Sequence, residues 1–385
     1  MNPKQIVVGI DASNIKRGGG ITHLSNLLNS FRPEKYGIDK IILWGGEPIL
    51  NKIDNNPWLD KINIPRVDTR FIFRLYWNFF KLKIEAEKYR CNLLFIPGGL
   101  FFTNFKPVVT MSRNMLPFEW RELRRFGLSK TTLRYLFLFI FQSLSFKRAD
   151  GIIFLTNYAK EKILSLIHLK NEQYKVIPHG VNKLLFKSPR SQLPPKLYSD
   201  KKPFKFIYIS IINKYKHQKN VVCAIEMLRK RGIPITLDLI GPAFKPSLKQ
   251  LIKKISNIDP NSNYLRYLGE KSYEELIRLY HKADGFIFAS SCENMPNILL
   301  EAMASGLPIA CSNKGPMPEI LKEGGLYFNP ENIDSITSSI YNLFESEKLR
   351  KEKSELAYKY SQEYTWEKCA EATFLYISKN VRIAG

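Results

Sequence analysis

The chain of 385 residues is long enough for about two domains, and its content of 44% hydrophobic and 13% aromatic residues is ample for their cores. Five scattered cysteines fit neither a disulfide framework nor a metal-ligand spacing, which indicates a reducing, cytoplasmic setting. No apolar run approaches the roughly 20 residues of a membrane-spanning helix, and the first run ends at Asp11, so we expect no signal peptide. A net charge of +24 predicts an anionic partner, which could be nucleic acid, an acidic membrane surface or a phosphorylated substrate.

The first predicted elements are a strand at residues 6–10 and an amphipathic helix over residues 21–28. The loop between them ends in Gly18, Gly19 and Gly20. Glycine lets a backbone approach an anion closely, so a strand, a glycine loop and a helix in this order indicate phosphate binding. A tight turn that binds nothing is the alternative.

Apolar runs at residues 41–44, 93–96 and 108–111 alternate with helical segments, which predicts a doubly wound α/β domain. Two stretches near these strands, residues 71–83 and 120–148, mix aromatic and basic side chains. Such a mixture suits an anionic membrane surface, and equally a core helix with a basic side in solvent. The membrane interpretation is favoured if both stretches lie on the same face of the protein.

The composition changes to Ser, Pro and Lys at residues 188–202, which indicates a linker or a surface loop. A second alternating domain then begins with a strand at residues 206–210. The loop after that strand carries Lys214, Lys216 and Lys219 ahead of an apolar helix. Basic residues between the carboxyl end of a strand and the start of a helix form a good cradle for a diphosphate.

The stretch 283–320 predicts a strand, a loop, a helix and a second strand. The first strand is the apolar run 285–289, and the second is 309–311. Pro296 suits a first helical position, and Gly306 suits the end of a helix. The loop therefore lies at the carboxyl end of a parallel strand, where open α/β sheets bind their ligands.

The helix in this stretch is apolar on nearly every side except for one polar stripe. Asn297, Glu301 and Ser305 form that stripe, at positions i, i+4 and i+8. An unpaired buried carboxylate is costly, so we expect Glu301 to face a polar cleft or a ligand rather than solvent at a rim. Glu293 precedes it by seven intervening residues, within reach of the same ligand.

Residues 293–310, ENMPNILLEAMASGLPIA, closely resemble the family 4 retaining glycosyltransferases of the GT-B fold, in which this E-x7-E segment binds a nucleotide-sugar donor. IPHGV at residues 177–181 and GGLYFNP at 324–330 match further segments of the family. The resemblance implies two Rossmann-like, doubly wound domains facing across a cleft. Residues 1–185 form the acceptor-side domain and 186–365 the donor-binding domain. Residues 366–385 form a helix that crosses back to the first domain.

By this resemblance Glu293 contacts the donor sugar and is a catalytic candidate, and Glu301 hydrogen-bonds the donor ribose. The family's arginine place falls on Ser210 or Ile211, with Lys214 or Lys219 as candidate replacements. The residues expected to bind the donor are Gly18, Gly19, Gly20, Lys216, Asn294, Met295, Asn297 and Glu301. Where the family carries a His-Asp pair, this chain has Ser112 and Arg113, so Arg113 and Asn114 become catalytic candidates that stabilise the leaving phosphate or hold a sugar hydroxyl.

The implied activity is transfer of a sugar, with retention, from a UDP- or GDP-linked donor to a glycan or lipid-linked glycan of the cell envelope, such as lipopolysaccharide or capsule. No cofactor is implied. No two aspartates are two residues apart, so basic residues and helix N-termini would take the place of a metal. The expected location is the cytoplasm, with the inner face of the plasma membrane as a peripheral site.

Two other classes of function stay open. One is a nucleotide-sugar epimerase on the same architecture. The other is an inactive or non-enzymatic basic protein that binds membrane or nucleic acid. The second alternative explains the net charge of +24 but not the E-x7-E context. Nucleic acid is not favoured, because the sequence shows no recognition module for it.

Overall fold

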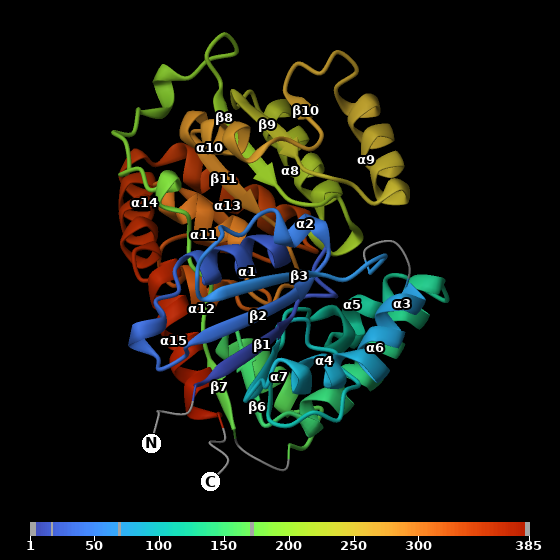
Figure 1. The fold of residues 1–385 in the computed structure, drawn as a ribbon. Coiled ribbons are helices and arrows are strands. Elements are labelled where there is room, and N and C mark those ends of the chain that lie inside the picture. The colour runs from blue at the N-terminus through green and yellow to red at the C-terminus, as the bar shows by residue number, and fades with distance from the viewer. Residues whose placement is uncertain (1–4, 17, 68–70, 170–172, 382–385) are drawn as a thin grey trace. The chain divides into compact units, whose positions relative to one another are not determined.

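The computed structural model describes residues 5–16, 18–67, 71–169 and 173–381. The chain divides into two compact units, each built around one parallel sheet (Figure 1). Unit 1 comprises residues 1–118, 128–180 and 365–385, and unit 2 comprises residues 119–127 and 181–364. The predicted α/β class is thus confirmed. Residues 119–127 group with unit 2, whereas the sequence analysis placed them in the first domain.

The sheet of unit 1 has seven parallel strands in the order β3-β2-β1-β4-β5-β6-β7. Its strands are β1 (Val7–Asp11), β2 (Lys40–Gly45), β3 (Leu59–Asn63), β4 (Leu93–Ile96), β5 (Val108–Met111), β6 (Gly151–Phe154) and β7 (Tyr174–Val176). Its helices are α1 (Gly19–Asn29), α2 (Glu47–Leu50), α3 (Phe71–Tyr76), the π-helical segment η2 (Trp77–Lys81), α4 (Leu82–Lys88), α6 (Lys130–Arg148), α7 (Asn157–Leu164) and α15 (Trp366–Lys379), with short turns η1 (Pro33–Lys35) and η3 (Leu116–Phe118). The two edge strands, β3 and β7, were not predicted, because their half-buried residues are too polar to form an apolar run.

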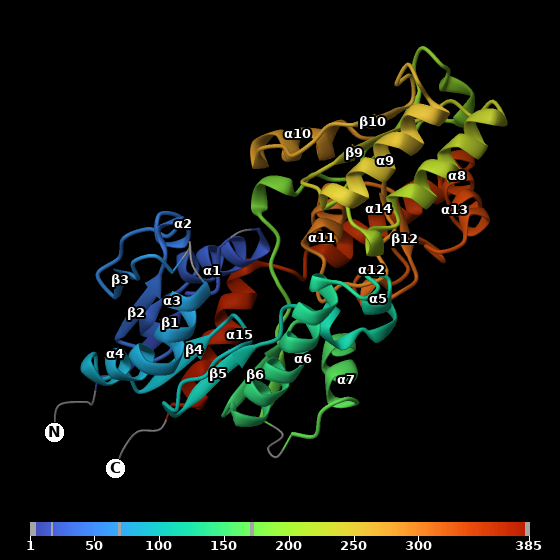
Figure 2. The same cartoon turned by 90° about the vertical axis from the view of Figure 1, so that its right-hand side faces the viewer.

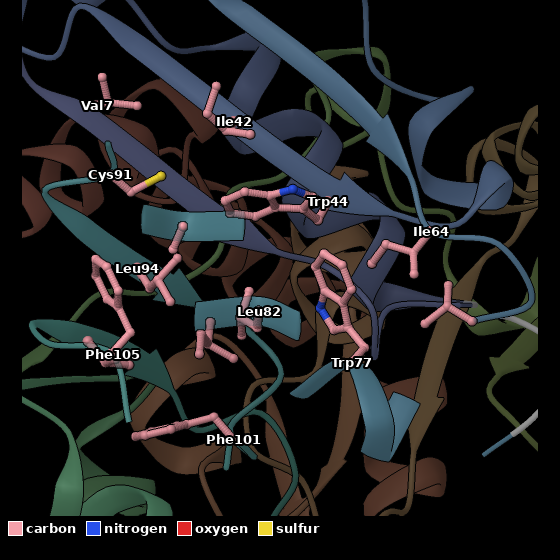
Figure 3. Close-up of a cluster of buried hydrophobic side chains, with 14 residues drawn as sticks. Val7, Ile42, Trp44, Ile64, Trp77, Leu82, Cys91, Leu94, Phe101 and Phe105 are labelled. Carbon is pink, nitrogen blue, oxygen red and sulfur yellow. The ribbon is translucent and has the colours of Figure 1, made fainter. Parts of the chain in front are cut away.

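One core cluster of unit 1 lies between the sheet and the segment η2–α4 (Figure 3). Trp44 of β2 and Leu94 of β4 meet Trp77 and Leu82 there. The Trp77 indole N–H also donates to the Asp11 carboxylate at the end of β1, at 3.2 Å. One side of η2–α4 is therefore anchored on the sheet, and the opposite side faces outward.

The sheet of unit 2 has six parallel strands in the order β10-β9-β8-β11-β12-β13. Its strands are β8 (Phe204–Ile209), β9 (Ile235–Ile240), β10 (Leu265–Tyr267), β11 (Gly285–Phe288), β12 (Ile309–Ser312) and β13 (Leu326–Phe328). Its helices are α5 (Trp120–Arg124), α8 (Gln218–Lys230), α9 (Lys245–Ile258), α10 (Tyr273–Lys282), α11 (Asn297–Ala304), α12 (Met317–Leu321), α13 (Ile333–Glu345) and α14 (Glu347–Ser361), with short turns η4 (Lys183–Leu185), η5 (Pro195–Leu197) and η6 (Lys214–Lys216). This strand order is that of a dinucleotide-binding doubly wound domain.

The helices of unit 2 form two layers (Figure 2). Helix α8 packs against α9 and α13, and α11 packs against α14 and α12. Strands covered on both faces must be apolar throughout, and every residue of β9, β11 and β12 is buried.

The segment 120–148 is two helices rather than one. Helix α5 ends before Gly127, whose φ of +61° suits glycine, and α6 begins at Lys130. Helix α6 belongs to unit 1 and α5 to unit 2. Across the described part of the chain, the structure contains no helix with the length and apolar character needed to cross a membrane.

Candidate functional site

The candidate site of unit 2 lies where β8 and β11 run side by side. The strand order reverses between these two strands, so the loops at their carboxyl ends diverge and leave room for a ligand. Ser291 ties the two loops together through three hydrogen bonds. Its amide and its hydroxyl donate to the Tyr215 carbonyl at 2.9 and 3.2 Å, and its hydroxyl lies 2.8 Å from Nε2 of His217.

A buried ion pair joins the same two loops. The ammonium group of Lys216, from the loop after β8, donates to the carboxylate of Glu293, from the loop after β11. The side chains are only 6% and 16% exposed, and the Lys216 ammonium lies 5.2 Å from the ring centre of Phe288. The Tyr208 hydroxyl donates to the Lys216 carbonyl at 2.6 Å, which fixes the loop backbone. The structure thus brings together Lys216 and Glu293, two residues that the sequence analysis expects to contact the same donor.

Next to Lys216, the backbone of His217 is strained. Its φ of +49° is one that residues other than glycine rarely adopt. Burial lowers the pKa of His217 to about 4, so the ring is neutral when it meets Ser291. Strain of this kind persists only where the surroundings hold it, and it concentrates at functional sites.

Helix α11 begins at this site without a side-chain cap. Pro296 was predicted to be the first residue of this helix. It is instead the residue just before the helix, because its backbone is extended, with a ψ of 100°. The Oδ1 atom of Asn297 is buried and has no hydrogen-bond partner among the residues that the structure describes. Uncapped backbone amides and an open acceptor at a helix start suit a polar, anionic ligand. Asn294 and Met295, in the turn before the helix, are buried.

Glu301 lies on the second turn of α11. Its carboxylate accepts a hydrogen bond from the hydroxyl of Tyr280 in α10, at 3.0 Å. Burial raises the pKa of Glu301 to about 7, and the Tyr280 bond opposes that shift. Glu301 is half-buried and bonded to Tyr280, which favours the cleft over the exposed rim as its surroundings. Tyr280 is a site residue that the sequence did not reveal, because only the packing of α10 on α11 defines it.

The place of the family's arginine is occupied by a polar turn. The Gln218 side-chain amide, at the start of α8, donates to the Ser210 hydroxyl at 2.9 Å and to the Ile211 carbonyl at 3.0 Å. This turn carries no positive charge.

The two candidate replacements for that arginine, Lys214 and Lys219, line a recess of about 310 Å³ together with Arg125, His217 and Ser247. Lys216 and Glu293 are not among the residues that line this recess. The Lys214 ammonium donates to the Arg125 carbonyl at 2.7 Å. The Arg125 guanidinium is paired with Glu122 and Glu331. The three basic side chains thus gather beside the Lys216–Glu293 pair rather than on it.

In unit 1 the glycine segment 18–20 contacts Arg113, one of the catalytic candidates. Gly18 precedes α1 with a φ of +60°, whereas Gly19 and Gly20 already belong to the first helical turn rather than to the loop. A Cβ atom on Gly20 would lie 3.2 Å from Nη1 of Arg113, so this guanidinium packs directly on the Gly20 backbone. Burial lowers the pKa of Arg113 to about 10. Asn114 has a structural bond, since its Oδ1 accepts from the Leu116 amide at 3.2 Å.

Two buried histidines lie close to Arg113. The rings of His23 and His179 are 4.6 Å apart, and both pack against Trp366 of α15. Burial and the charge of Arg113 lower the pKa of His179 to about 3. Burial, together with the proximity of His179 and Arg113, also lowers the pKa of His23 well below its usual value. The pair is therefore neutral, and His23 is fully buried.

Solved structures share the fold of this chain. A pair of doubly wound α/β domains is the GT-B fold of glycosyltransferases, and HepE of Anabaena, solved in complex with UDP-glucose, superimposes with a TM-score of 0.70 at 16% identity, over 97% of this chain and 98% of that one. Residues 189–360, which make up most of unit 2, match the family model described as Glycosyl transferases group 1.

Two curated relatives align with part of the chain. O-antigen chain mannosyltransferase B of Escherichia coli is 26% identical over 231 residues, which is 59% of this chain and 57% of that protein. An uncharacterized glycosyltransferase of Methanocaldococcus jannaschii is 27% identical over 225 residues, which is 57% of each chain. The matched region thus spans little more than half the length of each relative.

Proposed function

We propose that this protein is a glycosyltransferase that moves a sugar from a nucleotide-sugar donor to a glycan or lipid-linked glycan acceptor in cell-envelope polysaccharide synthesis. The observation that carries the proposal is the Lys216–Glu293 pair beside the uncapped start of α11, within a domain that matches the family model. The donor complex of HepE and the O-antigen activity named for the Escherichia coli relative support the substrate classes.

In this proposal the donor diphosphate binds Lys216 and the free amides at the start of α11. Glu301 accepts hydrogen bonds from the donor ribose, with Tyr280 holding its carboxylate in place. Glu293 contacts the donor sugar. Asn294, Met295 and Asn297 complete the donor contacts. The donor is UDP- or GDP-linked, and the protein needs no separate cofactor.

Unit 1 contributes five residues to the proposed donor site and its chemistry, Gly18, Gly19, Gly20, Arg113 and Asn114. The glycines allow close backbone approach to the donor phosphates. Arg113, held against Gly20, stabilises the charge that develops on the leaving phosphate, and Asn114 holds a sugar hydroxyl.

The proposed chemistry is retaining and independent of a metal. The leaving diphosphate takes the proton of the acceptor hydroxyl as the new glycosidic bond forms on the same face. Basic side chains and helix amides supply the positive field that a metal would otherwise supply. Within the described residues, no group of three His, Cys, Asp or Glu side chains is placed to hold a metal ion. The proposed location of the protein is the cytoplasm, with peripheral binding to the inner face of the plasma membrane.

Calorimetric titration with UDP, GDP and ADP tests the donor site. We expect selective binding of one nucleotide, lost in Glu301→Ala and kept in Glu355→Ala, whose side chain is exposed on α14. The nucleotide that binds identifies the donor to use in activity assays. Activity that persists in EDTA tests independence from a metal, and NMR of the product anomer tests retention. Absence of binding by all three nucleotides would favour a non-enzymatic basic protein, and an inverted product would contradict the retaining step.

A further inference from the structure

The outer side of the segment α3–η2–α4 in unit 1 is apolar and uncovered. Ile72, Tyr76, Phe79, Phe80 and Ile84 are each between 50% and 70% exposed. Their spacing places them in one stripe along the segment, opposite the anchored residues Trp77 and Leu82. A stripe of large apolar side chains in solvent is unfavourable for an isolated protein and usually marks a contact surface.

The first half of α6 shows the same feature. The run 135–141 is apolar or aromatic at every position, yet none of its residues is buried. Leu133 and Ile140, about two turns apart on the same side of the helix, are 69% and 52% exposed. Full burial in α6 begins only at Gln142. A helix that is apolar on every side is normally enclosed, so this half lacks its covering partner.

The two helical segments belong to one surface. Phe79 of η2 stacks on Phe102 with ring centres 4.3 Å apart, and Phe102 meets Phe141 of α6 at 5.5 Å. Phe141 continues the row to Phe137 at 4.2 Å. Aromatic contact is thus continuous from one segment to the other. We call the exposed side chains of α3–η2–α4 and α6 the apolar–basic surface.

Basic residues outnumber acidic ones on this surface. Helix α6 carries Lys130, Arg134, Lys147 and Arg148 and no acidic residue. The segment α3–η2–α4 carries four basic residues, Arg74, Lys81, Lys83 and Lys88, against two acidic ones, Glu85 and Glu87. Two copies of this chain that met through the surface would bring these cations together, which disfavours self-association. Aliphatic side chains such as Ile72 and Ile140 offer no stacking face to a nucleic acid base.

We propose that the apolar–basic surface docks on an anionic lipid bilayer, with its aromatic and aliphatic side chains at the level of the acyl boundary and its lysines and arginines among the headgroups. Apolar area and attraction to anionic lipid together give the affinity of such surface helices. The inference deepens the proposed location at the membrane, and it does not depend on sugar transfer.

Sedimentation with vesicles of phosphatidylcholine, with and without phosphatidylglycerol, tests the proposal. We expect binding that requires the anionic lipid and weakens at high salt. Phe79→Ser with Phe80→Ser should reduce partitioning at least about tenfold, because the two rings together contribute about that factor or more when each is inserted roughly halfway into the lipid. Leu133→Ser with Ile140→Ser is a second variant on α6, which keeps the test valid if the first pair disturbs folding.

Leu197→Ser with Ile252→Ser is the matched control, since both side chains are exposed and lie in unit 2. This control should bind vesicles as the wild type does. Equal binding by the surface variants, or no preference for anionic vesicles, would overturn the proposal. A wild-type dimer that the surface variants dissociate would instead identify a contact between copies. Nucleotide binding measured on the same preparations separates failure of this proposal from failure of the proposed function.

Discussion

The ion pair between Lys216 and Glu293 makes a specific prediction about donor binding. In the ligand-free protein the Lys216 ammonium already has a carboxylate partner. A diphosphate that uses the same ammonium must displace that partner. Glu293→Gln removes the competing charge and nearly preserves the shape of the side chain. We therefore expect this variant to bind UDP or GDP more tightly while sugar transfer slows, because the proposed sugar contact is weakened.

The burial of the pair sets the size of the effect. With side chains only 6% and 16% exposed, solvent screens the interaction weakly. A hydrogen bond to a charged group is worth about 1.5–3 kcal/mol, which corresponds to roughly 10- to 100-fold in affinity as an upper limit. The pair Lys230–Glu226 on α8 is the control, since its lysine is 74% exposed and solvent screens such a surface pair strongly.

Calorimetry on the wild type, Glu293→Gln, Glu226→Gln and Lys216→Met measures the effect. Breaking one side of a buried pair destabilises the free protein by about 3–5 kcal/mol, so Glu293→Gln should melt at a lower temperature than the wild type. Nucleotide should then raise the melting temperature of this variant by more than it raises that of the wild type. Lys216→Met should weaken binding. If Lys216→Met weakens binding but Glu293→Gln binds no more tightly than Glu226→Gln, the competition argument is wrong.

Two further predictions concern pH. Burial raises the pKa of Glu301 from its ordinary value of 4.5 to about 7, so between these two pH values the folded protein holds a proton that the unfolded chain has released. The stability from this proton is present below pH 4.5 and lost as the pH rises through 7, and Glu301→Gln should be more stable than the wild type at pH 8 by up to about 3 kcal/mol in urea denaturation. The pKa of His179 is lowered from 6.5 to about 3, so its contribution to stability is present above pH 6.5 and falls by up to about 1.4 kcal/mol per pH unit as the pH drops toward 3. His179→Phe should remove that slope in thermal melts at pH 7 and pH 5, and an unchanged slope would contradict the neutral-pair interpretation.

Where sequence-based prediction succeeded, the signal was local. The strand, loop and helix around Glu293 follow from an apolar run, a polar break and a terminating glycine within a short stretch. Gly306 illustrates the reason, since its φ of +63° is a backbone conformation that glycine adopts readily at the end of a helix. That residue therefore marks the end of α11 without knowledge of the rest of the fold.

Prediction was weaker where the pattern was faint or the partners were distant. The edge strands β3 and β7 lack an apolar run, because edge strands bury fewer of their residues. The neutral His23–His179 pair depends on the packing of α1 against α15, which comes from the far end of the chain. No property of either histidine's neighbours in sequence indicates that it is buried.

The sequence by itself determined the α/β class, the Glu293–Glu301 stretch and the net positive charge, because periodicity, turn residues and composition act over a few neighbouring residues. The tertiary structure decided which of these features meet. The pairing of β8 with β11 brings Lys216 to Glu293, and the packing of α10 on α11 brings Tyr280 to Glu301. Anchoring of Trp77 on the sheet leaves Phe79 and Phe80 facing outward. These are contacts between residues distant in sequence, and the order of strands in the sheet and the packing of the helices establish them.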